Sequence, residues 1–194
     1  MDKSKAVKVL VDNICIRLSL FAKQIEKVTS DPNLKIIGFH EWLLFLIHHI
    51  DYLAFSKGLE ENQRYLVREE IFRNLLERDI LPPKVESEMI DRGEKPSIRS
   101  LGGDNPVIIF SLMKSFRQEA NERDEYYSTC TTLVGKYPLD ERGFVNKLIN
   151  NIVMSSGCGR NFLNEILITD IAVSLLLNKK LAKEDMKALD TFKD

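Results

Sequence analysis

The fold is decided by residues 39–55, which read FHEWLLFLIHHIDYLAF. Apolar side chains occupy nearly every side of a helix drawn through this stretch, and a helix that is apolar all round is usually buried. The helix is expected to span residues 34–57, because Gly58 then supplies the left-handed residue that often follows a helix. We therefore expect this segment to be the central helix of an all-α domain.

Apolar residues recur at helical spacing in five further segments. The clearest pattern is the first, where Val7, Val11, Ile14 and Leu18 are separated by four and three residues in turn, as in the seam of a bundle helix. The segment at 161–181 is nearly as apolar as the central helix. The chain is thus predicted to be a single-domain helical bundle over residues 1–181, followed by a charged tail at 182–194 that frays. About six helices are expected, at residues 4–29, 34–57, 60–79, 106–134, 140–156 and 161–181.

The middle of the chain has a different composition. Prolines and glycines gather in residues 81–105, which are expected to form a long irregular connection with a short helix near 85–92. Connections of this length in compact domains are often functional. The segment is therefore a candidate lid or partner-binding loop.

Charge and cysteine content exclude several classes of partner. The 194 residues include 28 Lys and Arg against 29 Asp and Glu, so the chain lacks the basic surplus of nucleic-acid-binding and polybasic membrane-docking proteins. Its apolar runs are shorter than the roughly 20 residues that a membrane span needs. Cys15, Cys130 and Cys158 form no paired motif, which is typical of a reducing compartment. We expect a cytoplasmic protein without nucleic-acid or membrane partners.

The central helix carries a cluster of ionisable side chains. At 100° per residue, Glu41 and His48 lie within about 40° of each other, and Asp51 lies about 60° from His48. A histidine between carboxylates can be a metal ligand or a general base, or the groups can simply satisfy one another as a buried polar pair. If His48 bridges carboxylates, His48→Ala should destabilise the fold more than His49→Ala.

A second candidate is Asp170. Its helical neighbours are apolar apart from Ser174, so the carboxylate is expected to be buried and to need a partner on another helix, with His48, Arg68 and Lys114 as candidates. The candidate metal ligands are therefore Glu41, His48, Asp51 and Asp170.

Two other motifs favour ordinary structural roles. Glu119, Glu122 and Glu125 are spaced by three but lack a second facing set, so they are expected to form a solvated face with a Glu119–Arg123 ion pair. Cys158 lies between two glycines and precedes a helix, where the glycines are expected to make a turn.

No complete catalytic pattern occurs in the sequence, and no cofactor is indicated. This favours a non-enzymatic helical module that binds another protein or regulates one, and a homo-oligomer is compatible with the pattern. The alternative is a metal- or small-molecule-binding bundle centred on the four candidate ligands, with hydrolysis among the reactions open to it.

Overall fold

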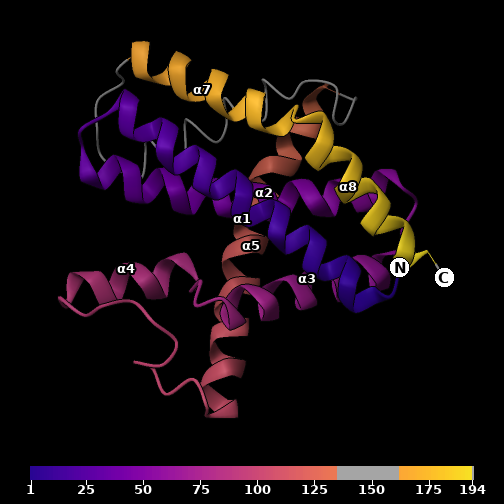
Figure 1. Ribbon diagram of the computed structural model, residues 1–194, viewed down its shortest axis with the longest axis horizontal. Coiled ribbons are helices and arrows are strands. Elements are labelled where there is room, and N and C mark those ends of the chain that lie inside the picture. The colour runs from indigo at the N-terminus through magenta and orange to yellow at the C-terminus, as the bar shows by residue number, and fades with distance from the viewer. Residues whose placement is uncertain (135–161, 194) are drawn as a thin grey trace.

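The computed structural model describes residues 1–134 and 162–193, with the backbone alone described at 125–134, 162–167 and 169 (Figure 1). All regular structure in these residues is helical, which confirms the all-α fold. The expected helix at 140–156 and the turn at Cys158 lie outside the described residues. The helices are α1 (Lys3–Val28), α2 (Pro32–Ser56), α3 (Glu61–Glu77), α4 (Pro83–Asp91), α5 (Pro106–Val134), α7 (Phe162–Leu176) and α8 (Lys179–Leu189), followed by the 3-10 helix η1 (Asp190–Phe192).

Helix α2 is buried along most of its length, as its composition predicts. Its first turn is set by Pro32 and by the Asp31 carboxylate, which accepts hydrogen bonds from backbone N–H groups of that turn. Further along, Trp42 is fully buried and stacks against Phe21 of α1 and Phe45, at ring separations of 5.3 and 5.4 Å. Helix α1 contacts α2, α3, α7 and α8, so α1 and α2 together form the centre of the bundle.

Helix α7 does not share this central position. It packs on the core through Ile168, Ala172 and Leu176, which recur every four residues on one side of the helix. Asp170 lies on another side and is exposed. The expected burial of Asp170 is therefore wrong, because an apolar helix at the edge of a bundle still has one face in solvent.

Residues 179–192 are ordered and packed instead of forming the expected frayed tail. Asp185 of α8 is completely buried and makes an ion pair of 2.8 Å with Arg17 of α1, whose side chain is 1% exposed. The Asn13 side-chain amide donates to the same carboxylate at 2.8 Å. Burial raises the pKa of Asp185 although Arg17 and Asn13 oppose that rise. The ion pair fixes α8 against α1.

Helix α4 divides the long connection and depends on α5 for its start. The residue before it is Pro82, which offers no side-chain cap. Instead the Glu119 carboxylate of α5 accepts a hydrogen bond from the Lys84 backbone N–H at 3.1 Å, and the Ser115 hydroxyl donates to its other oxygen at 3.1 Å. Glu119 is only 9% exposed, and burial raises its pKa. The expected solvated role for Glu119 is therefore wrong.

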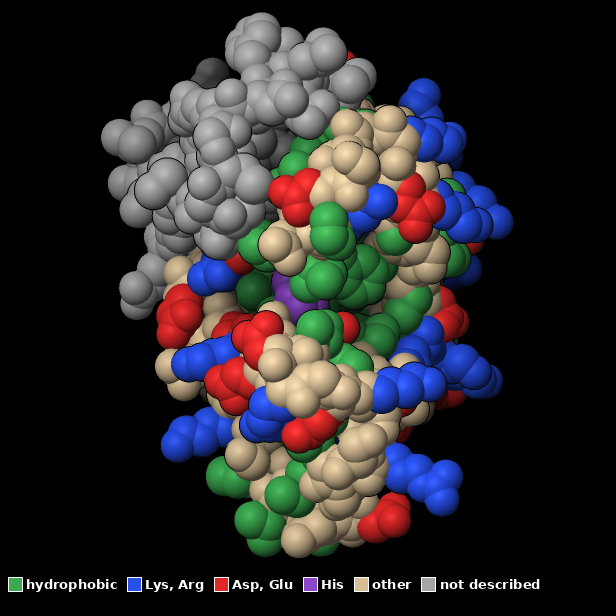
Figure 2. All heavy atoms as spheres, turned by 90° about the vertical axis from the view of Figure 1, so that its left-hand side faces the viewer, with side chains coloured by type: hydrophobic (Ala, Val, Ile, Leu, Met, Phe, Trp, Pro, Cys, Tyr) green, Lys and Arg blue, Asp and Glu red, His purple; other side chains and the backbone are tan. Residues whose placement is uncertain are grey.

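Helix α5 crosses the bundle, and its N-terminal end extends beyond α3 and α4 at the lower edge of Figure 1. Figure 2 shows hydrophobic side chains at this lower end and also near the middle of the face in view, with acidic and basic side chains interspersed around them. Within the described residues, no helix is long and apolar enough to cross a membrane.

Candidate functional site

The polar side chains of α2 meet α5 and α3 along one side of the bundle. Arg123 of α5 donates from Nε to both carboxylate oxygens of Glu41, at 3.1 and 2.9 Å, and from Nη2 as well. The Glu41 side chain is 4% exposed. Forked contacts of this kind are the strongest ion pairs in proteins, so Glu41 fixes α5 on α2. Arg123 thus pairs with Glu41 instead of the expected Glu119.

The next residue of α5, Asp124, joins three helices. His48 Nδ1 of α2 lies 2.7 Å from Asp124 Oδ1, and Arg68 of α3 donates to Oδ2 at 2.5 Å. Burial alone would raise the pKa of Asp124, but the hydrogen bond from His48 and the charge of Arg68 together hold it below its usual value. The Asp124 carboxylate is consequently ionised and holds His48 in one orientation.

Asp51 lies at the other end of this polar region. Arg64 of α3 donates to its Oδ2 at 2.9 Å. Burial raises the pKa of Asp51, and the charges of Arg64 and Arg68 only partly oppose this. The arrangement ties the C-terminal part of α2 to the first turns of α3.

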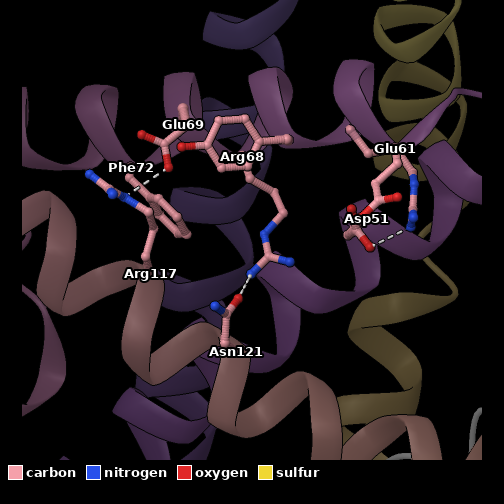
Figure 3. A pocket seen from close by; sticks show the side chains of 9 residues that line it. Asp51, Glu61, Arg68, Glu69, Phe72, Arg117 and Asn121 are labelled. Carbon is pink, nitrogen blue, oxygen red and sulfur yellow. Dashed lines mark hydrogen bonds and ion pairs between the residues drawn. The ribbon is translucent and has the colours of Figure 1, made fainter.

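Beside these contacts lies a pocket of about 230 Å³ between α3 and α5, which we call the α3–α5 pocket (Figure 3). Phe72 forms its apolar wall and stacks on Phe116 of α5 at 5.2 Å. Arg68 extends across the pocket toward Asn121, to which it donates at 3.3 Å. The pocket is lined by Asp51, Glu61, Arg64, Tyr65, Arg68, Glu69, Phe72, Arg117 and Asn121.

Each arginine of the pocket already has a carboxylate partner. Arg64 pairs with Asp51 and Arg68 with Asp124, while Arg117 Nε lies 3.0 Å from Glu69 Oε1. The lining has three arginines and three acidic residues. Its formal charge is therefore balanced, and the guanidinium groups are held in place before any ligand binds.

Exposed aromatic rings stand next to the same arginines. The guanidinium of Arg64 lies 5.3 Å from the ring centre of Phe55, and that of Arg117 lies 5.7 Å from the ring centre of Phe110. Phe55 is 61% exposed, Phe110 63% and Tyr65 53%. Tyr65 lines the pocket itself, whereas Phe55 and Phe110 flank two of its arginines, and we call these three residues the aromatic rim.

The four candidate ligands do not gather at one point. Glu41, His48 and Asp51 follow one another along α2 and contact Arg123, Asp124 and Arg64, whereas Asp170 is exposed on α7. In the part of the chain that the structure describes, no group of three or more His, Cys, Asp or Glu side chains has the geometry of a metal site. Two of the residues suggested as partners of Asp170 contact a different carboxylate. Arg68 and His48 both bind Asp124.

The residues that sequence reasoning missed are the arginines and Asp124. A signal was present on α3, where Arg64 and Arg68 are four residues apart and so lie on one side of the helix. On α5, Arg117, Asn121 and Asp124 have the same helical spacing. Neither pattern indicates which helix lies opposite, so the pocket could not be assembled from spacing alone.

Comparisons of the chain with protein-family models, with curated proteins and with solved structures give no match.

Proposed function

We propose that the protein is a non-enzymatic interaction module that receives a segment of another protein at the α3–α5 pocket. The observation that carries this proposal is the aromatic rim beside carboxylate-paired arginines. Aromatic residues and arginine are the side chains most enriched at the centres of protein interfaces. The exposed aromatic rings beside the pocket's arginines offer apolar area that a partner could cover.

The size of the pocket favours a protein side chain over a free small molecule. Pockets for small molecules are usually about 300–1,000 Å³, whereas this one is about 230 Å³. That volume accommodates one large side chain of a partner. The remaining contact area would come from the aromatic rim.

The charge of the pocket also narrows the ligand class. Arg64, Arg68 and Arg117 are each neutralised by an acidic side chain, so a phosphate or other compact anion gains little net attraction there. A partner segment with both donors and acceptors fits such a lining better. Fixed guanidinium groups also lose little side-chain entropy on binding, which supports affinity.

The metal-binding alternative has no observation in its favour among the described residues, where Glu41 and Asp51 are engaged by arginines. It remains testable. Metal analysis of protein purified without chelators, together with melting curves with and without EDTA, would support it if a stoichiometric metal stabilised the fold.

The proposal is tested by affinity purification from the source cells followed by quantitative mass spectrometry. Tyr65→Ala removes a rim residue, and Leu177→Ala is a matched control, because Leu177 is 54% exposed and lies on the edge of the bundle. A partner should be retained by the wild type and the control and be depleted about tenfold or more by Tyr65→Ala, as for a hot-spot residue. Equal recovery with all three proteins would refute the proposed site.

A further inference from the structure

We propose that the N-terminal end of α5 binds the same end of a second copy of this chain, in an antiparallel contact around a twofold axis. The inference rests on the proposed function, because it names a partner for the surface that begins at Phe110 of the aromatic rim. The self-contact surface consists of Asp104, Val107, Phe110, Ser111 and Lys114.

The N-terminal end of α5 is exposed to solvent. Val107 is 71% exposed and Phe110 is 63% exposed, the highest values among the large hydrophobic residues that the structure describes. The end extends past α3 and α4 in Figure 1, and hydrophobic side chains are visible there in Figure 2. A second helix can therefore approach it without meeting the rest of the bundle.

The exposed surface continues along α5 into a surface that packs against α3. Val107, Phe110, Lys114, Arg117 and Asn121 are spaced by three and four residues and so lie along one side of α5. At its inner end α3 covers this row, since Glu69 pairs with Arg117 and Arg68 donates to Asn121. At its outer end the described residues include no hydrogen-bond or ionic partner for Lys114. The row is thus covered by a helix over one half and open over the other.

Charged residues stand at both ends of the open part of this surface. The acidic Asp104 lies in the turn just before α5, the apolar Val107 and Phe110 follow on the first turns of the helix, and the basic Lys114 comes last. When two such helix ends run antiparallel, the turn that carries Asp104 in each copy lies next to Lys114 of the other. Val107 of each copy then lies opposite the turn that contains Phe110 and Ser111. The surface is therefore complementary to itself, as a twofold contact requires.

The same charge order disfavours a membrane as the occupant. Helices that lie on membranes carry an excess of Lys and Arg on their polar face. Here Asp104 and Lys114 balance each other, and the whole chain has a net charge of −1. Two copies also meet without long-range repulsion at this charge.

The test is sedimentation velocity of the full chain over a wide concentration range at low salt. The wild type should be a concentration-dependent dimer. Phe110→Glu should weaken the dimer by about tenfold or more, since it places a charge in the apolar centre. Leu177→Glu, which changes another exposed apolar residue, in the turn just after α7, should leave the dimer unchanged.

Charge exchange separates the self-contact from a general loss of solubility or folding. Asp104→Lys alone places a second lysine opposite Lys114 of the other copy, and Lys114→Asp alone opposes two aspartates, so each variant should weaken the dimer several-fold. An equimolar mixture of the two variants should form a mixed dimer, because both of its contacts are attractive. The double variant should recover as well, and Lys180→Asp on α8 is the control for charge reversal elsewhere.

Each other outcome overturns the inference. A wild-type monomer at all concentrations, a dimer indifferent to Phe110→Glu, or a mixture that does not associate would each do so. A monomer whose cellular partner is lost with Phe110→Glu would assign the surface to a different protein and leave the proposed function standing. A monomer that floats with vesicles containing anionic lipid would assign it to a membrane.

Discussion

The buried ion pair between Arg17 and Asp185 yields the prediction with the largest expected effect. Both side chains are withdrawn from water, at 1% and 0% exposure, and their charged atoms lie 2.8 Å apart. Asp185→Ala leaves a buried guanidinium without its countercharge, which typically costs about 3–5 kcal/mol. Since domains are stable by only about 5–15 kcal/mol, this one change should remove about a fifth or more of the folding free energy.

Replacing both partners should have a different effect. In Arg17→Met with Asp185→Leu no charge is left to bury, and such replacements are often neutral or stabilising by about 1–4 kcal/mol. The double variant should therefore be far more stable than Arg17→Met or Asp185→Leu alone, although two residues have changed. Urea unfolding followed by circular dichroism measures all four proteins, and equal slopes would show that the same surface is exposed each time.

Arg73→Ala is the matched control, because the Arg73–Glu70 pair is 56% and 41% exposed. Exposed pairs contribute about 0–1 kcal/mol, so this variant should unfold close to the wild type. The reasoning fails if Asp185→Ala costs no more than Arg73→Ala, or if the double variant loses as much stability as the two single variants added together.

Three further predictions concern the polar groups on α2 and α5. His48→Ala should lower the melting temperature more than His49→Ala, because it removes a 2.7 Å bond to Asp124; equal melting curves would contradict this. Burial and the charges of Arg17 and His48 lower the pKa of His49 to about 3. The wild type should therefore lose stability as the pH falls from about 6.5 toward 3, since only the unfolded chain gains that proton. His49→Leu should flatten this part of the profile of melting temperature against pH, and parallel profiles would exclude the effect. Glu119→Ala should speed amide exchange throughout α4 by removing its cap, worth about 0.5–2 kcal/mol, and unchanged exchange in α4 would count against it.

The sequence was most informative about α2. Its apolar residues lie on all sides, so its burial follows from composition whatever packs around it. Helix α8 was missed for the opposite reason. Residues 179–189 contain four lysines and one glutamate, and one of the positions facing the core is Asp185, an acidic residue of the kind usually found at the surface. Its burial depends on Arg17 and Asn13, which lie far away in the sequence.

The same distinction applies to the candidate site. The helical spacing of Glu41 and His48 correctly identified buried ionisable groups, at 3% and 8% exposure. Their partners could not be predicted, because His48 and Asp124 are 76 residues apart. The predicted burial of Asp170 was wrong for a related reason. Apolar neighbours within one helix do not reveal which side of that helix faces another helix.

The hydrogen bond from the Lys84 backbone to Glu119 has a consequence for how the middle of the chain acquires its structure. A nine-residue helix is too short to persist in water by itself, and α4 obtains its terminal acceptor from a residue 35 positions further along. During synthesis residues 83–91 therefore stay without helical structure until α5 has been made. Any cellular event that pulls α5 away would return residues 83–91 to that state and offer them to proteases.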